Sequence, residues 1–185
     1  MPEDMVTPEM RRAAKAVNFG IVYGISAFSL AKDIDVSVAK ADRYIKSYLS
    51  NFPKVKEFMD KAIADAESKG YSETIFGRRR YIPELAAKNK NIQSFGKRAA
   101  MNAPVQGAAA DIIKIAMVKV FRRLRDEKLD AHLILQIHDE LIVEAENGAA
   151  EKAAEILKRE MENAAKLSVP LRADVKIGAS WYETK

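Results

Sequence analysis

The chain has 185 residues, 48% of them hydrophobic, and a formal net charge of +5 at pH 7, which is typical of a globular sequence long enough for one domain or two small subdomains. It contains no cysteine, which excludes disulfides, thiolate nucleophiles and cysteine zinc sites. It has no apolar run long enough to cross a bilayer, and its amino-terminal residues lack a signal-peptide pattern, so we expect a cytoplasmic protein with no membrane partner.

The amino-terminal part of the chain predicts a series of helices. Thr7 can cap a first helix that has Pro8 in its first turn and should run to about Val22. Further along, Gly70 is a typical residue at the end of a helix, because glycine tolerates the left-handed backbone found there. Helical spacing of apolar residues predicts the intervening helices over residues 28–34, 36–52 and 54–70.

A short hairpin and a long helix are expected next. The stretch YSETIFGRRRYIPEL predicts two short strands around a turn at Gly77. From Asn91 to Leu129 the pattern is helical, with interruptions expected at Pro104 and Gly107. Pro104 should kink this helix, because proline cannot donate the backbone hydrogen bond of a regular turn.

The pattern changes again towards the carboxyl end. AHLILQI and ELIVEAE predict a β-hairpin with His138 and Asp139 at its turn. An amphipathic helix is expected over residues 148–167, followed by a closing strand over 171–177, LRADVKI. A mainly helical part, followed by a small antiparallel sheet packed on helices, indicates an α+β fold.

Basic residues gather in clusters upstream of residue 131. These clusters are RR at 11–12, GRRR at 77–80, KR at 97–98 and FRRLR at 121–125. They indicate either a polyanionic partner or an ordinary solvated helix surface, and charge alone leaves both interpretations open.

One basic and aromatic stripe is predicted on the first helix. Arg11, Lys15, Phe19 and Tyr23 recur every four residues, which places them within a stripe of roughly 120°. The cations could hold a phosphate chain near the helix start, and an aromatic ring further on offers a face for a sugar or base. The alternative is a solvent edge of cations beside aromatic residues of the core.

Two adjacent carboxylates stand at the predicted hairpin turn. Asp139 and Glu140 separate two apolar strands, and carboxylate oxygens are the protein ligands that Mg²⁺ prefers. Since successive strand residues point to opposite faces, we favour Asp139 as the direct ligand and Glu140 as a secondary one. An ordinary polar turn is the alternative.

A polar stripe also interrupts the alanine-rich segment KRAAMNAPVQG. Arg98, Asn102 and Gln106 are spaced four apart, as on one face of a helix. They could hydrogen-bond to bases or phosphates, or they could satisfy backbone groups near Pro104.

Several segments together resemble family A DNA polymerases, the bacterial DNA polymerase I type. RRAAKAVNFGIVYG resembles motif B, the nucleotide-binding helix, and QIHDEL resembles motif C. The segments TIFGRRRYIP, KRAAMNAPVQGAAADIIK and VPLRADVKIGASWYE are also similar to that family, in the same order along the chain. The resemblance covers essentially the whole sequence and implies DNA-directed DNA polymerase activity with two Mg²⁺ ions as cofactors.

The resemblance also implies roles for individual residues. Arg11 and Lys15 would hold the triphosphate of the incoming dNTP, and Lys15 would also protonate or neutralise the leaving pyrophosphate. Phe19 would pack on the sugar and Tyr23 would lie at the insertion site. The residues implied to contact primer-template DNA are Arg98, Asn102, Gln106 and His138, and those implied for catalysis and metal binding are Asp139 and Glu140.

The resemblance further implies how the chain is organised. Residues 1–90 would be fingers-like and 91–185 palm-like. Motif A, which carries another metal-binding aspartate, and the thumb have no counterpart in this sequence. We therefore expect a carboxyl-terminal fragment that has little activity alone and needs the amino-terminal part of the polymerase as a partner.

Two other functions are alternatives to a DNA polymerase. The first is a non-catalytic module that binds nucleic acid or nucleotides. The second is a phage-type single-subunit RNA polymerase, which shares a motif B helix and a His-Asp turn. Phe19 within NFGIVYG, and Glu140 within QIHDEL, favour the DNA enzyme.

Overall fold

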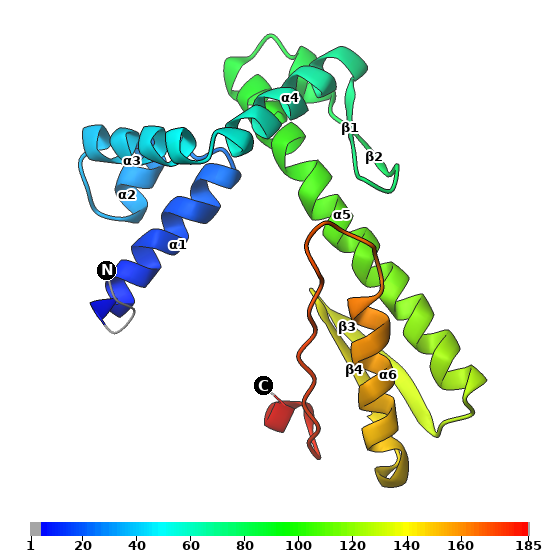
Figure 1. Cartoon of the computed structure of the whole chain (residues 1–185). Helices are drawn as coiled ribbons and strands as arrows, with labels where there is room; N and C mark the ends of the chain where they lie inside the picture. Colours follow the sequence, from blue (N-terminus) through cyan, green and yellow to red (C-terminus); the bar gives the residue numbers. More distant parts are fainter. Residues whose placement is uncertain (1–4, 185) are drawn as a thin grey trace. The chain divides into compact units, whose positions relative to one another are not determined.

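The computed structural model describes residues 5–184 and has an α+β fold, in which helices predominate and two short antiparallel hairpins are inserted between them (Figure 1). The α+β prediction is confirmed. The chain divides into two compact units, Met1–Gly107 and Ala108–Lys185. None of the helices within residues 5–184 combines the length and the apolar character that crossing a membrane requires.

Four helices open the first unit: α1 (Pro8–Val22), α2 (Ala27–Asp33), α3 (Val38–Asn51) and α4 (Pro53–Lys69). Thr7 caps α1 as predicted, since its side chain accepts a hydrogen bond from the Met10 amide at 3.2 Å. A small core formed by Leu30, Ala31 and Ala41 holds α2 against α3. The predicted bounds of these helices agree with the structure to within about two residues, as is usual for helix ends.

The first hairpin follows α4 directly. Gly70 ends α4 with φ +78°, and β1 (Tyr71–Glu73) pairs antiparallel with β2 (Arg79–Tyr81) around Gly77, whose φ is +84°. The 3₁₀ turn η2 (Pro83–Ala86) then leads to the next helix. A second small core packs this region together and consists of Ala66, Ile82, Leu85, Ala99 and Ala100.

The long helix α5 (Lys90–Asp126) runs without a break through Pro104 and Gly107, so the interruptions predicted at these two residues are wrong. Proline removes one backbone donor, and the remaining hydrogen bonds of a 37-residue helix are enough to carry the helical path past it. A kink at Pro104 stays a prediction. The boundary between the two units falls after Gly107, within α5, so residues 91–107 belong to the first unit. The division into fingers-like and palm-like regions also stays a prediction.

The second unit packs a hairpin and a helix against the carboxyl-terminal part of α5. Strand β3 (Ala131–Ile137) pairs antiparallel with β4 (Glu140–Ala145), and η3 (Asn147–Ala149) leads into α6 (Ala150–Glu162). The core contains residues of all three elements: Ala116, Val120, Leu124, Ala131, Leu141, Ala153, Ile156, Leu157 and Ala164.

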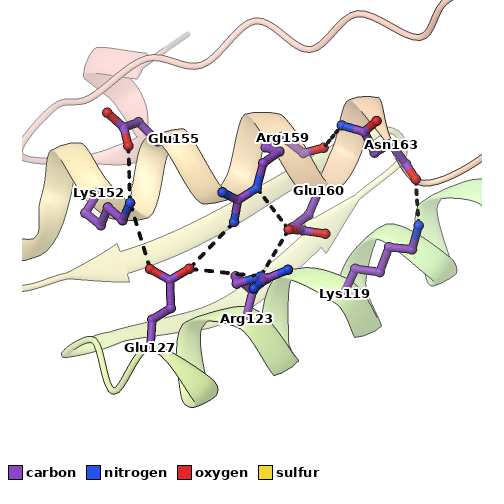
Figure 2. Close-up of polar contacts among 8 residues, drawn as sticks. All are labelled: Lys119, Arg123, Glu127, Lys152, Glu155, Arg159, Glu160 and Asn163. Carbon is purple, nitrogen blue, oxygen red and sulfur yellow. Dashed lines mark hydrogen bonds and ion pairs between the residues drawn. The ribbon is translucent and has the colours of Figure 1, made fainter.

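Ion pairs reinforce the contact between α5 and α6 (Figure 2). Glu160 accepts hydrogen bonds from Arg123 at 3.3 Å and from Arg159 at 3.2 Å, and its side chain is only 12% exposed. Glu127 lies 3.6 Å from Arg159, and Lys119 donates to the carbonyl of Asn163 at 2.6 Å. The charged edge of α6 is thereby fixed to α5.

The predicted closing strand over residues 171–177 is wrong. This segment has no strand pairing, and the sheet of β3 and β4 has two strands within the described part of the chain. An apolar alternation makes a segment suitable for a sheet, but a strand also needs a partner edge to pair with. Here the Ala173 amide instead donates to the Glu162 carboxylate at 3.2 Å, and the chain ends in η4 (Trp181–Thr184).

Candidate nucleotide and metal site

The predicted stripe on α1 faces solvent. Arg11 and Lys15 are exposed, and so are the rings of Phe19 (52%) and Tyr23 (44%). The two rings stack with their centroids 6.2 Å apart, and the Lys15 ammonium lies 5.8 Å from the centre of the Phe19 ring. Because these aromatic residues are not buried, the alternative of a purely structural core position does not describe them.

Phe19 and Tyr23 line a pocket between α1 and α5. This pocket has a volume of about 290 Å³, and Asn102 and Gln106 of α5 form its other side. The structure therefore brings together four of the residues that the sequence singles out, from two helices far apart in the chain. A lining that contains two aromatic and two amide side chains suits a flat ligand that also carries hydrogen-bonding groups, such as a base.

Asn102 has an unusual environment in this pocket. Its Oδ1 atom is buried and has no hydrogen-bond partner among the described residues. A buried acceptor without a donor costs free energy, so this atom would gain a hydrogen bond if a rearrangement of the side chain brought a donor within reach. Asn102 therefore combines a place in the pocket lining with a side-chain acceptor that the described residues leave unsatisfied.

Gly24 sets the distance between the end of α1 and α5. Its φ is +73°, and a Cβ atom there would lie 2.4 Å from the Met101 side chain and 3.1 Å from Cγ of Arg98. The positive φ favours glycine here, and a side chain at this position would also require the flexible side chains of Met101 and Arg98 to shift. Arg98 is thus placed beside the end of the aromatic stripe.

The β3–β4 turn carries the remaining site residues in the second unit. His138, Asp139 and Glu140 are all exposed, and His138 has φ +53°, which is uncommon for a residue with a side chain. The Gln136 side chain donates to the carbonyl oxygen of His138 at 2.6 Å and holds this conformation. Left-handed residues of this kind cluster at functional sites.

The two carboxylates fit a magnesium ion in the chemistry of their donor atoms. Mg²⁺ is commonly held by one or two carboxylates, together with water and the phosphates of a substrate. Residues 5–184 contain no group of three or more histidine and acidic side chains placed to hold a metal ion. Asp139 and Glu140 can therefore supply part of a coordination shell that other groups complete.

Sequence reasoning missed several residues that the structure brings to these sites. Tyr48 of α3 lines the pocket with Asn18 and Val105, but α3 carries no motif that distinguishes Tyr48 from a core residue. Gln136 lies within the QIHDEL segment, yet its contact with the turn depends on hairpin register, which the sequence does not give.

Comparison with known proteins identifies the family. Residues 1–183 match the model of DNA polymerase family A. The chain is 51% identical over 180 residues to DNA polymerase I of Caldicellulosiruptor bescii, covering 97% of this chain and 21% of that protein. It is 49% identical over 183 residues to DNA polymerase I of Bacillus caldotenax, with 99% and 21% coverage.

A solved structure is also similar. It is the POL domain of Pol1 from M. smegmatis in complex with DNA primer-template and dNTP, with a TM-score of 0.89 and 40% identity over 93% of this chain and 30% of that one. The chain spans about a fifth of the length of the curated relatives it matches. On the match of the family model to nearly all of its residues, the chain belongs to DNA polymerase family A.

Proposed function

We propose that this chain forms part of a DNA-directed DNA polymerase that transfers a nucleotidyl group from a dNTP to the 3′-hydroxyl of a primer. The single observation that carries the proposal is the pocket lined by Phe19 and Tyr23 of α1 together with Asn102 and Gln106 of α5. Membership of the family and the similarity to a polymerase domain solved with primer-template and dNTP support the same function.

The residues of α1 would bind the incoming nucleotide. Arg11 and Lys15 carry positive charge in the first two turns, where the helix dipole also favours a phosphate group. Phe19 would pack on the sugar and Tyr23 would lie at the insertion site. Lys15 would also donate a proton to the departing pyrophosphate, or neutralise its charge.

The residues of the β3–β4 turn would bind metal. Asp139 would be a direct ligand of two Mg²⁺ ions, and Glu140 a secondary one, with the oxygens of the nucleotide phosphates completing the shell. When bound, the ions would lower the pKa of the primer hydroxyl and stabilise the charge of the displacement. The chain's own contribution is to hold both carboxylates on a short, hydrogen-bonded turn.

Four residues would contact primer-template DNA. Asn102 and Gln106 present amides at the pocket, and Arg98 lies beside Gly24 at the end of α1. His138 lies in the β3–β4 turn, directly before Asp139. Contacts of amide and guanidinium groups with DNA position the strands as well as read base edges. Residues 1–90 would be fingers-like and residues 91–185 palm-like.

We further infer that the chain alone extends primers poorly. One pair of carboxylates provides little compensating charge for two dications, so further acidic ligands from the amino-terminal part of a polymerase are needed. A chimera in which this chain replaces the matching 180 residues of the Caldicellulosiruptor bescii enzyme would supply them.

The test is primer extension by this chimera with Mg²⁺ and dNTPs, compared with Asp139→Ala and Lys15→Ala variants. We expect extension by the chimera, its loss in Asp139→Ala, and a raised KM for dNTP with unchanged primer-template affinity in Lys15→Ala. A chimera that binds DNA but does not extend, with binding unaffected by Asp139→Ala, would instead indicate a non-catalytic nucleic-acid-binding module.

A further inference from the structure

The arginine-rich segment GRRR at residues 77–80 belongs to a hairpin that is fixed on α5. The Ser72 hydroxyl of β1 donates to the carbonyl oxygen of Ala100 at 3.0 Å, and both Ser72 and Thr74 are buried. At Gly107 a Cβ atom would lie only 2.5 Å from the methyl group of Thr74. These two contacts, seven residues apart on α5, hold β1 along about two turns of the helix.

The alternation of side chains places the arginines of this segment on different faces. Ser72 pairs with Arg80, and Glu73 pairs with Arg79. Directly opposed residues of an antiparallel pair share a face, so Arg80 lies on the face that packs against α5, and Arg79 lies on the other. An arginine on a helix-facing surface needs a reason, because its charge must remain solvated or paired.

Arg79 already has partners on its own face. Its guanidinium donates to the Glu73 carboxylate at 2.8 Å and lies 4.7 Å from the centre of the Tyr71 ring. The hydrogen bond to Glu73, with a smaller contribution from Tyr71, raises the pKa of Arg79 above its usual value. Arg79 therefore already has an ion-pair partner and an aromatic partner within the hairpin.

Arg80 is different. Its side chain is exposed and forms no ion pair with a residue in the described part of the chain. Residues 78–80 line a pocket of about 250 Å³, whose other walls include Ser72, Thr74, Gln106 and Gly107. By the strand register, Arg80 rather than Arg79 directs its side chain to the α5 side of the hairpin. The pocket therefore places the guanidinium of Arg80 near the amide of Gln106, two groups that can donate hydrogen bonds to an anion.

Gln106 connects this pocket with the candidate site. It lines both the arginine-lined pocket and the pocket of Phe19 and Tyr23, so the two pockets share this residue of α5. A nucleic-acid strand that presents a base to one pocket has backbone phosphates within a nucleotide or two of it. The arginine-lined pocket is placed to receive such a phosphate.

We propose that Arg80 binds a phosphodiester group of a DNA strand whose end lies at the Phe19–Tyr23 pocket. This inference rests on the proposed function and adds a DNA contact beyond Arg98, Asn102, Gln106 and His138. A guanidinium binds phosphate oxygens in a bidentate manner, and a phosphate contact positions a strand without reading its sequence. The triphosphate of the nucleotide is assigned to the separate cations of α1, which leaves the strand as the source of this phosphate.

The experiment measures binding of the full chain to a fluorescent primer-template duplex across a series of KCl concentrations. Arg80→Gln removes both the charge and the bidentate guanidinium group, whereas Arg80→Lys keeps the charge without the guanidinium. Arg43→Gln is the matched control, because Arg43 is an exposed arginine of α3 in the same unit that lines neither pocket. Thermal unfolding followed by circular dichroism verifies that each variant is folded.

We expect Arg80→Gln to weaken binding about tenfold near physiological salt and to reduce the slope of log K against log [KCl] by about one unit. Arg80→Lys should keep the slope while losing part of the affinity. Arg43→Gln should bind like the unaltered chain. Affinity for a fluorescent dNTP in the absence of DNA should be the same in the unaltered chain and in Arg80→Gln.

Three results would overturn the proposal, each in a distinguishable way. If the slope of log K against log [KCl] were equal for the unaltered chain and Arg80→Gln, Arg80 would not contact a DNA phosphate, although the chain would still bind DNA. Weaker dNTP binding by Arg80→Gln with unchanged DNA binding would assign the pocket to the nucleotide. No DNA binding by the unaltered chain at any salt concentration would overturn this proposal together with the proposed DNA partner.

Discussion

The side-chain amide of Gln136 donates a hydrogen bond to the main-chain carbonyl of His138 at 2.6 Å, directly before Asp139. This contact supports a turn in which His138 has φ +53°. A left-handed residue with a side chain costs about 1–2 kcal/mol, and the amide offsets part of that cost. The orientation of the proposed metal ligand therefore depends on a neighbouring residue that does not bind metal itself.

Replacing Gln136 by Met tests this dependence. Loss of the hydrogen bond should lower the free energy of unfolding by about 1 kcal/mol, measured by urea denaturation. In the chimeric polymerase, the Mg²⁺ concentration for half-maximal extension should rise several-fold, because the turn no longer holds Asp139 in one orientation. Leu135→Met, at a neighbouring exposed position, is the control and should change neither quantity. If the Mg²⁺ concentration for half-maximal extension did not change in Gln136→Met, Gln136 would not be needed to orient Asp139.

Replacing Asn102 by Leu should affect the stability of the protein and its affinity for DNA differently. Its buried Oδ1 has no partner among the described residues, so Asn102→Leu removes an unsatisfied acceptor while keeping a similar side-chain shape. The free energy of unfolding should stay within about 0.5 kcal/mol or rise, whereas primer-template affinity should fall about tenfold. A clear loss of stability would mean that Asn102 is held by the protein itself and not by a ligand.

The close approach of Gly107 and Thr74 predicts that a substitution at Thr74 can restore stability lost by a substitution at Gly107. Alanine normally favours a helix over glycine by about 1 kcal/mol, but at Gly107 its methyl group would collide with the Thr74 methyl group, which lies 2.5 Å from that position. Gly107→Ala should therefore destabilise the protein. Thr74→Ser removes the obstructing methyl and keeps the hydroxyl that accepts hydrogen bonds from the Phe76 and Arg78 amides.

The measurement is a double-mutant cycle by thermal or urea unfolding. The double variant should be more stable than Gly107→Ala alone by about 1 kcal/mol or more, so that the two changes are strongly non-additive. If the changes in unfolding free energy of the two single variants were additive, Thr74 and Gly107 would not be in contact.

The ion pairs between α5 and α6 predict a measurable coupling. Arg123 lies 3.3 Å from Glu160, whose side chain is only 12% exposed and also accepts from Arg159 (Figure 2). A double-mutant cycle with Arg123→Met and Glu160→Gln should give a coupling energy of about 1 kcal/mol that falls at high salt.

Lys54 and Glu57 provide the control for this cycle. Their side chains are 87% and 65% exposed, and a pair so open to water should give a coupling of at most about 0.5 kcal/mol. If the two cycles gave equal energies, burial of Glu160 would not strengthen the contact between α5 and α6.

Sequence alone determined the local structure and the identity of the candidate residues. Thr7 and Gly70 mark helix ends through their own backbone chemistry, and the turn at His138 and Asp139 is placed by the alternating strands around it. These signals act over a few residues, so they need no knowledge of distant contacts. The resemblance to a polymerase family rests likewise on continuous segments of the chain.

Tertiary structure decided which residues meet and which predicted elements form. Residues 171–177 have the pattern of a strand but no partner edge among the described residues, and α5 continues through Pro104. Whether Phe19 belongs to a core or to a pocket, and whether Gln106 also borders the arginines of the hairpin, depends on helices that lie far apart in the chain. Pairing and packing are long-range properties, and periodicity within one segment carries no information about the surface that segment will face.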